Sequence, residues 1–219
     1  MTRALDIFVA LIGCLILLMM LPVVAVLIKL ESKGPVFFAC DRVGRGGRPF
    51  KMYKFRTMYE TPAPVWASLS PLMDPRVTRV GRVLRRLKIN ELPQFFNVLK
   101  GDMTLIGPRP EALDLAAAYP DYARKIFLAR PGLAGPNQIL GRNEEEFYPL
   151  GVDPVQYYVD HILPPKVAVD LAYLANKSFR EDLWLLFLAA KVTITGAISR
   201  RHLMQSRGQL AFLGVDALC

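Results

Sequence analysis

An uninterrupted apolar run occupies residues 7–28, where the chain carries no charged side chain. Because about 20 apolar residues span a hydrocarbon core as a helix, the run predicts a helix in or on a membrane. It is too long for a signal peptide, and no small-residue cleavage site follows it. Pro22 lies inside the run and removes one backbone hydrogen bond, which predicts a kink. A kinked span and a hairpin that returns to the same side both fit, since basic residues flank the run at both ends.

The pattern then changes to short alternating segments, at residues 36–39 and 49–56, which predict a β-hairpin. The turn between them, residues 42–48, is rich in glycine and arginine. Such a turn can hold phosphate through backbone N–H groups, although a solvated loop fits the same sequence. Residues 61–71 contain prolines and serines and are expected to form a loop.

Arginines recur at helical spacing after Asp74 and Pro75, two residues that together favour a helix start. The basic positions are Arg76, Arg79, Arg82 and Arg86, and the apolar positions on the opposing side are Val77, Val80, Leu84 and Leu87. The pattern predicts an amphipathic helix whose basic side faces solvent or anionic headgroups. One or two of its arginines remain candidates for substrate contacts.

Residues 88–111 join a polar, acidic turn to an apolar helix and then to an arginine between two prolines. The apolar face of the helix consists of Leu92, Phe95, Phe96 and Leu99, and Gly101 is expected to end it. Asn90 and Glu91 therefore lie at its N-terminal end, where the helix dipole favours anions and an acidic side chain can hold a metal. For Asn90, an N-cap is the simpler interpretation.

Four helical segments are predicted in the C-terminal half, at residues 112–128, 154–162, 166–175 and 181–195. Asp153 and Pro154 give the second of them a start signal. The last is apolar enough for the core or for the surface of a bilayer. The acidic residues 144–146 are expected in a solvated loop, and the tail from residue 200 is basic.

Composition narrows the function. The chain of 219 residues is 53% hydrophobic and has a formal net charge of +9. Apolar and basic character together indicate an anionic membrane surface, or a phosphate-rich ligand near one. A nucleic-acid binder would not need the apolar N-terminus, so no nucleic-acid partner is expected. Three widely spaced cysteines without a histidine cluster support neither a disulfide framework nor a zinc site, and favour a reducing compartment.

Several ordered motifs cover most of the chain. They are Lys54-Phe55-Arg56-Thr57-Met58, Asp74-Pro75-Arg76-Val77-Thr78-Arg79-Val80-Gly81, Glu91-Leu92-Pro93-Gln94, Asn97-Val98-Leu99-Lys100-Gly101-Asp102-Met103, Gly107-Pro108-Arg109-Pro110 and Arg130-Pro131-Gly132. With these motifs the chain resembles the bacterial sugar transferase family, the small monotopic phosphoglycosyl transferases that begin membrane glycoconjugate assembly.

The resemblance implies an α+β, mostly helical fold in three parts. Residues 1–33 would form a re-entrant, helix-break-helix membrane segment, although the family's usual Ser-Pro at the break is Leu21-Pro22 here. Residues 34–199 would form a small cytosolic transferase domain with a β-hairpin and amphipathic surface helices, and residues 200–219 a basic tail. The implied location is the cytosolic face of the bacterial inner membrane, on anionic phospholipid. A homo-oligomer is left open.

The implied reaction transfers a sugar 1-phosphate from a UDP-sugar to a polyprenyl (undecaprenyl) phosphate with Mg²⁺ and releases UMP. This would be the first membrane step in the assembly of a capsule, exopolysaccharide, O-antigen or other glycan. Carried over by position, Glu91 becomes a metal ligand, Arg85 and Arg109 phosphate binders, and Lys54 a substrate contact. Asp74 and Asp102 also match family positions, but they are better interpreted as structural.

The catalytic pair departs from the family. The family has Asp-Glu, with the aspartate attacking phosphorus to form a covalent phosphosugar, and this chain has Asn90-Glu91. A neutral amide is a poor nucleophile and brings no charge to a metal, so the covalent route does not carry over. Three explanations of Asn90 remain open. It is an engineered substitution, or a natural variant in which Glu91 or direct attack by the lipid phosphate replaces the missing step. In the third explanation, the chain is a catalytically inactive relative that binds or assembles at the membrane surface.

Two other departures indicate a divergent branch. Gly135-Pro136-Asn137-Gln138 stands where the family tends to have Gly-Trp-Ala-Gln, and residues 144–165 have the character of an insertion. Divergence makes a natural asparagine more credible.

Overall fold

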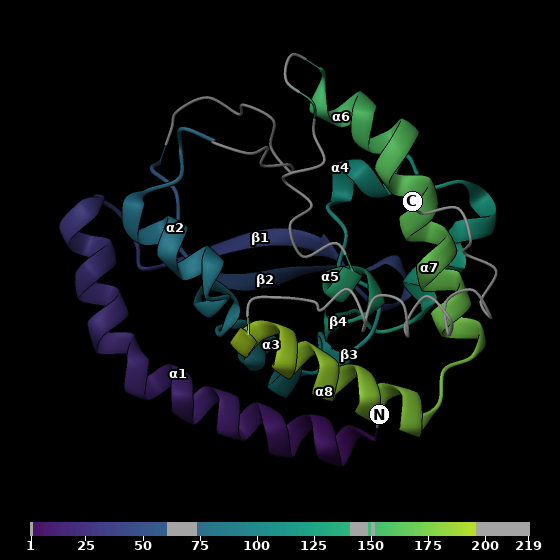
Figure 1. The fold of residues 1–219 in the computed structure, drawn as a ribbon, viewed down its shortest axis with the longest axis horizontal. Coiled ribbons are helices and arrows are strands. Elements are labelled where there is room, and N and C mark those ends of the chain that lie inside the picture. Colours follow the sequence, from purple (N-terminus) through teal and green to yellow (C-terminus); the bar gives the residue numbers. More distant parts are fainter. Residues whose placement is uncertain (1, 61–73, 141–148, 150–151, 196–219) are drawn as a thin grey trace.

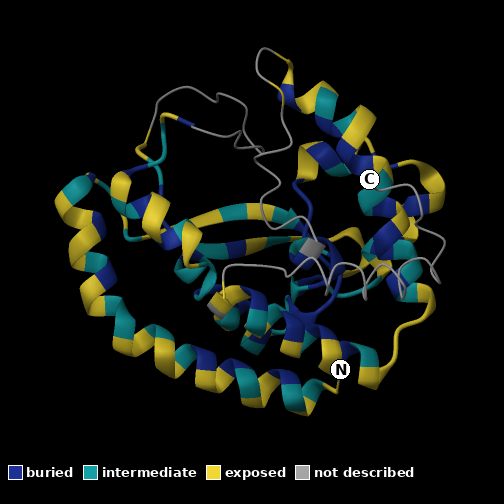
Figure 2. Cartoon of the chain, in the orientation of Figure 1, coloured by how far each residue is buried: buried dark blue, intermediate teal, exposed yellow. Residues whose placement is uncertain are grey.

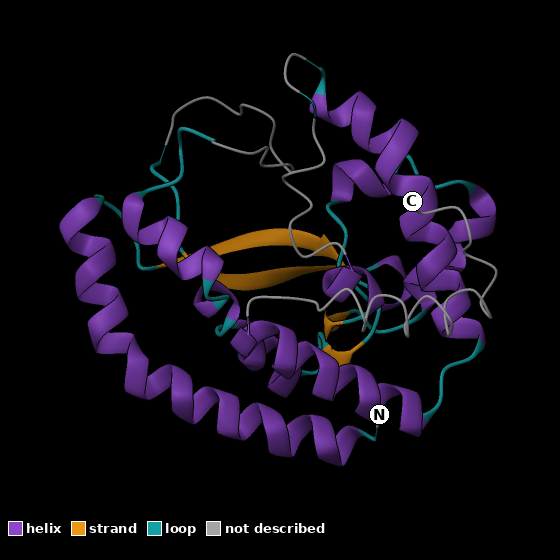
Figure 3. Ribbon diagram, viewed as in Figure 1, coloured by secondary structure: helices purple, strands orange, loops and turns teal. Residues whose placement is uncertain are grey.

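The computed structural model describes residues 2–60, 74–140, 149 and 152–195. In these residues, helices surround two small sheets at the centre of the molecule (Figure 3). The mostly helical α+β fold expected from the sequence is therefore confirmed. The proline-rich loop, the acidic residues 144–146 and the basic tail lie outside the described residues.

The elements follow one another along the chain as labelled in Figure 1. They are α1 (Arg3–Glu31), β1 (Phe37–Val43), η1 (Arg45–Gly47), β2 (Pro49–Phe55), α2 (Arg79–Arg86), η2 (Ile89–Glu91), α3 (Gln94–Lys100), β3 (Thr104–Ile106), α4 (Leu113–Ala116), η3 (Asp121–Leu128), β4 (Gly132–Ala134), α5 (Pro136–Leu140), α6 (Pro154–Tyr157), the π-helical η5 (Tyr158–Ile162), α7 (Leu163–Ala175) and α8 (Phe179–Thr195).

α1 is a single helix of 29 residues that contains Pro22. Figure 1 shows it bending as it passes around the outside of the domain, as expected when a proline interrupts the hydrogen-bond ladder. Within the described residues, α1 alone is long and apolar enough to cross a membrane. The break expected at Leu21-Pro22 is wrong, because Pro22 lies inside one continuous helix. The path of α1 relative to a bilayer, re-entrant or spanning, stays a prediction.

The outer side of α1 is apolar and exposed (Figure 2). The exposed side chains include Phe8, Leu11, Leu15, Leu18, Met19, Val23, Val26 and Leu30. An apolar surface of this extent on one helix indicates association with a membrane.

The inner side of α1 is fixed to the domain by polar contacts. Asp6 is buried and accepts hydrogen bonds from Thr104 Oγ1 at 2.9 Å and from the Leu105 backbone N–H at 3.0 Å. At the other end of α1, Glu31 accepts hydrogen bonds from the backbone N–H groups of Arg79 and Val80 at 2.6 and 2.7 Å. α1 is therefore attached both to β3 and to the start of α2.

Replacing Asp6 by alanine is expected to lower the free energy of unfolding by about 2–4 kcal/mol, because the Thr104 hydroxyl and the Leu105 N–H would be left buried without an acceptor. Denaturant titration of the purified protein in detergent would measure the loss. Asp121→Ala, which removes a fully exposed acid, is the matched control and should stay within about 0.5 kcal/mol. Equal stability of both variants would show that Asp6 does not attach α1 to the domain.

The predicted β-hairpin is confirmed. β1 and β2 pair in antiparallel register from Phe37 opposite Phe55 to Val43 opposite Pro49. The hairpin is held on α3 by Asn97, whose Oδ1 accepts from the Tyr53 backbone N–H at 3.0 Å and whose Nδ2 donates to the Lys51 carbonyl at 2.7 Å.

The predicted start of the basic helix is wrong. Asp74 does not cap a helix but pairs with the Arg76 guanidinium, with Oδ2 2.6 Å from Nη2. The helix begins at Arg79 instead, because Thr78 Oγ1 accepts from the Gly81 backbone N–H at 2.8 Å. Threonine is a good N-cap, and its hydroxyl satisfies one of the N–H groups that a helix start leaves unpaired.

The helix predicted over residues 112–128 is also wrong, since α4 and η3 are separate. Pro120 stands between them, and a proline disfavours helical backbone in the residue before it. The chain then forms β4, which pairs in parallel with β3. Gly132 allows this approach, because a Cβ there would lie 2.1 Å from the Gly107 backbone nitrogen. This small sheet was not predicted.

The C-terminal helices follow the prediction more closely. Asp153 caps α6 by accepting from the Val155 and Gln156 backbone N–H groups, and the helical chain continues through η5 into α7, which starts at Leu163 rather than at Lys166. α8 combines the two interpretations made for it. Its buried Leu185, Leu188 and Val192 belong to the core, and other apolar side chains of the helix are exposed.

Candidate functional site

The candidate site forms where α2 ends and the chain turns toward α3. Lys88, between the two helices, adopts a left-handed backbone conformation with φ +58°. The next three residues form the short helix η2, so that Asn90 and Glu91 precede α3 rather than begin it. Asn90 is buried and Glu91 half-buried.

Asn90 is not the N-cap of α3, which contradicts the simpler sequence interpretation. Pro93 occupies the N-cap position of that helix. Asn90 Oδ1 is instead buried without a hydrogen-bond partner in the described part of the chain. An unpaired buried oxygen costs about 1–3 kcal/mol, and a ligand that donates a hydrogen bond or a metal ion would satisfy it.

Glu91 is surrounded by positive charge. Burial raises the pKa of its carboxyl, but four nearby cations lower the pKa by a larger amount. The pKa therefore lies below the ordinary value. In order of effect these cations are Lys88, Arg109, Lys54 and Arg85. Glu91 is therefore ionised at neutral pH.

Lys54 reaches the same place from the end of β2. Burial lowers the pKa of its ammonium from 10.5 to about 8, Glu91 opposes the shift, and Arg109 adds to it. The site therefore holds an excess of positive charge that includes one readily titratable amine.

The positions of Arg85 and Arg109 are determined by contacts of the elements that carry them. Arg85 belongs to α2 and donates from Nε to Thr57 Oγ1 at 2.9 Å. Arg109 follows β3, and the two residues before it are bound to β4. The Gly107 backbone N–H donates to the Ala134 carbonyl at 2.9 Å, and the Gly132 N–H donates to the Pro108 carbonyl at 2.8 Å. The unpredicted pairing of β3 with β4 is therefore what positions Arg109.

The structure thus brings together the predicted residues Lys54, Arg85, Glu91 and Arg109, and it places Asn90 beside Glu91. Their individual roles stay predictions. Lys88 was missed, because no sequence signal announces a left-handed lysine between two helices. Asp102 lies in a structural position, as expected, with its Oδ2 3.2 Å from both Asn97 Nδ2 and Lys100 Nζ.

The donor atoms fit a magnesium ion that arrives with its phosphate ligand. No cluster of three or more His, Cys, Asp or Glu side chains occurs among the described residues. Mg²⁺ usually keeps several waters and binds one or two carboxylates together with substrate phosphates. Glu91 supplies one ionised carboxylate, and the unpaired Asn90 Oδ1 is a neutral oxygen next to it. The excess of cations suits a diphosphate better than a free metal ion.

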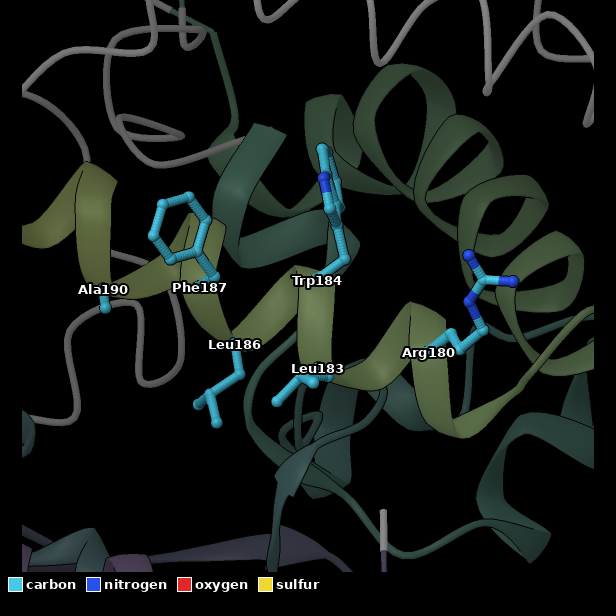
Figure 4. Close-up of a pocket in the computed structure, with 6 residues that line it drawn as sticks. All are labelled: Arg180, Leu183, Trp184, Leu186, Phe187 and Ala190. Atoms are coloured by element: carbon cyan, nitrogen blue, oxygen red, sulfur yellow. The ribbon is translucent and has the colours of Figure 1, made fainter.

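A second candidate region, a hollow on α8, lacks this chemistry. Its lining consists of Arg180, Leu183, Trp184, Leu186, Phe187 and Ala190, with no acidic side chain among them (Figure 4). Trp184 and Phe187 point to the same side of the helix. This surface is suited to apolar contacts and not to a metal.

The chain is similar to known proteins over most of its length. The family model for bacterial sugar transferases matches residues 1–196. A UDP-N-acetylgalactosamine-undecaprenyl-phosphate N-acetylgalactosaminephosphotransferase of Aeromonas hydrophila is 39% identical over 89% of this chain and 44% of its own length. A UDP-glucose:undecaprenyl-phosphate glucose-1-phosphate transferase of Caulobacter vibrioides is 36% identical over 88% of this chain and 69% of its own length.

A third relative, a putative undecaprenyl-phosphate N-acetylgalactosaminyl 1-phosphate transferase of Bacillus subtilis, is 54% identical over 50% of this chain and 61% of its own length. This chain spans less than half the length of the Aeromonas protein. The family match, in contrast, covers the apolar helix α1, the cationic site and the helices that support it. The chain therefore belongs to the bacterial sugar transferase family.

Proposed function

We propose that this chain transfers a sugar 1-phosphate from a UDP-sugar to a polyprenyl phosphate at the cytosolic face of the inner membrane, and that it releases UMP. The observation that carries the proposal is the ionised Glu91 among Lys54, Arg85, Lys88 and Arg109, in a domain fixed to an exposed apolar helix. Both substrates are anions, and one of them is anchored in lipid.

The cations act first on binding. Arg85 and Arg109 neutralise phosphate oxygens, and a guanidinium can contact two of them at once. Lys54 adds a compact charge from β2. Glu91 and the Asn90 amide oxygen would hold Mg²⁺, which when bound neutralises charge on the diphosphate. These fixed charges stabilise the transition state because they need no rearrangement as the negative charge moves.

The asparagine favours a single displacement. An oxygen of the polyprenyl phosphate attacks the sugar-bearing phosphorus, a new P–O bond forms, and the P–O bond to UMP breaks. UMP leaves with the electron pair, so the step requires no proton transfer. Asn90 has no lone pair suited to attack on phosphorus, and its role is to orient a ligand through Oδ1.

The apolar helix explains how the acceptor reaches the site. A polyprenyl chain remains in the bilayer, and α1 would keep the domain at the surface where the phosphate emerges. The re-entrant path implied by the resemblance returns both ends of α1 to the cytosolic side, and Asp6 and Glu31, which bind the domain near opposite ends of α1, favour that path over a span.

The experiment is incubation of the purified chain with Mg²⁺, polyprenyl phosphate and a panel of UDP-sugars, with UMP as the readout. UMP is expected only when donor and acceptor are both present, with intersecting rather than parallel initial-velocity lines. Absence of UMP with every donor would instead favour the second candidate, a silent relative that binds anionic membrane through the exposed Arg79, Arg82 and Arg86 of α2.

Nucleotide affinity is expected to depend on pH through Lys54. Because the pKa of Lys54 in the folded protein is about 8, its charge is present below that pH and is lost above it. The Kd for UDP should therefore weaken by about threefold to tenfold between pH 7 and pH 9.5. Calorimetric titration should find little pH dependence in Lys54→Met and retained affinity at pH 9.5 in Lys54→Arg. An unaltered profile in Lys54→Met would assign the dependence to another group.

A further inference from the structure

Glu111 is a buried acid directly after the Pro108-Arg109-Pro110 segment. It accepts hydrogen bonds from the Ala112 backbone N–H at 3.0 Å and from the hydroxyls of Tyr119 and Tyr158. Burial raises the pKa of its carboxyl, but Lys166 and the Tyr158 hydrogen bond lower the pKa by a larger amount. Glu111 therefore carries a charge at neutral pH. A buried charge needs cations nearby. Lys166 has the larger effect on Glu111, and Arg42 adds a smaller one through an ion pair.

Arg42 lies between Glu111 and the candidate site. Its Nη1 is 4.0 Å from Glu111 Oε1, and its charge also helps to lower the pKa of Lys54. The backbone fixes this placement, because Arg42 forms an isolated bridge with Ala112 and the Val43 N–H donates to the Glu111 carbonyl at 2.9 Å. Arg42 is thus held at the edge of the cationic site by the same segment that carries Arg109.

The Arg42 side chain has binding capacity left over. Only 16% of it is exposed, and its buried Nε has no hydrogen-bond partner in the described part of the chain. At 4.0 Å the contact with Glu111 is an ion pair without a close hydrogen bond, and it leaves N–H donors at the edge of the guanidinium for a ligand. A guanidinium in this state matches the oxygens of a phosphate group.

We propose that Arg42 binds a phosphate group of the substrates and that Glu111 is the positioning residue that holds Arg42 for this contact. The proposal rests on the function proposed above. Glu111 is in turn held by Tyr158 and Lys166, with Lys166 Nζ 3.0 Å from the Tyr158 hydroxyl. Tyr158 belongs to η5, so this short helix has a role in shaping the substrate site.

Binding measurements test the Arg42 contact without relying on turnover. Calorimetry of the full chain in detergent would compare UDP with a short-chain polyprenyl phosphate as probes. Arg42→Met is expected to weaken at least one of them by about tenfold or more, and Arg42→Lys should restore part of the loss. The probe that is affected identifies the donor or the acceptor as the source of the phosphate. Arg124→Met makes the same change at an exposed arginine of η3; it is the control and should bind both probes normally.

The positioning role of Glu111 is tested in a double-mutant cycle. Glu111→Gln keeps the size of the side chain and removes its charge, and should weaken the same probe several-fold while adding little in an Arg42→Met background. Unchanged affinity for both probes in Arg42→Met, or additive effects in the cycle, would overturn the proposal. UMP release by the unaltered chain distinguishes failure of this proposal from failure of the proposed function. If the unaltered chain releases UMP but Arg42→Met binds both probes normally, only the role of Arg42 is wrong. If Arg42→Met weakens binding but the unaltered chain releases no UMP, only the proposed function is wrong.

Discussion

Glu91→Gln is expected to reduce transfer by about 10³-fold or more in kcat/KM, because it removes the ionised carboxylate among the cations of the site. The side chain is half-buried. Burial raises the pKa of its carboxyl, but Lys88, Arg109, Lys54 and Arg85 together lower the pKa by more, so the wild-type carboxyl is charged at neutral pH. Glutamine has nearly the same shape. The loss therefore reports charge rather than packing.

The measurement is UMP release at saturating Mg²⁺ with a productive donor. Glu60→Gln makes the same chemical change at a largely exposed side chain and should leave the rate within about twofold. UDP affinity without a metal should not fall in Glu91→Gln, since one negative charge has been removed from an anion site. Activity above about a tenth of wild type in Glu91→Gln would exclude Glu91 as an essential group.

Asn90→Asp is expected to change the order of events. A carboxylate at this buried position would be able to attack the sugar-bearing phosphorus, so UMP should appear without acceptor, in a burst of up to one equivalent per protein. The unaltered chain should give no burst. Intact-protein mass spectrometry should find a sugar-phosphate adduct only in Asn90→Asp.

Asn176→Asp is the matched control, because it makes the same change at an exposed helix end, and it should give neither burst nor adduct. A burst from the unaltered chain would mean that another group, with Glu91 the first candidate, forms a covalent intermediate. A burst missing from Asn90→Asp, although overall transfer continues, would mean that this position does not reach the phosphorus.

The parts of the fold that local pattern determines were predictable. Alternating residues and a glycine-rich turn predicted the hairpin, and Gly101, which has φ +90°, ended α3 as expected. Asp153 and Pro154 began the helical stretch that ends in α7. In each case the signal and its structural consequence lie within a few residues.

The errors have a shared cause in non-local contacts. β3 pairs with β4 across more than 20 residues, and nothing within either three-residue strand announces the partner. Asn90 was predicted to be an N-cap because asparagine is frequent at that position. In the structure, η2 and the left-handed Lys88 place Asn90 before the start of α3. From the sequence, Arg42 was only one residue of a turn that could bind phosphate. Its contact with Glu111 depends on the fold, which brings the hairpin beside the segment after Arg109.

The burial of Asp6 at the start of α1 also depends on non-local contacts. It lies one residue before the uncharged run, and its burial depends on Thr104 and Leu105, which are distant in sequence. This attachment couples α1 to β3, the strand that precedes Arg109. The apolar helix α1 and the segment that carries Arg109 are therefore parts of one packed unit.

We expect the unaltered chain to move a sugar together with its phosphate onto a lipid. The most direct measurement uses a UDP-sugar labelled with ³H in the sugar and ³²P in the β-phosphate, incubated with polyprenyl phosphate and Mg²⁺ and then partitioned into organic solvent. We expect both labels to enter the lipid phase in equal molar amounts, in the same amount as UMP is released, and to be lost in Glu91→Gln. No transfer by the unaltered chain with donors that Asn90→Asp uses, or ³H in the lipid phase without ³²P, would contradict the account.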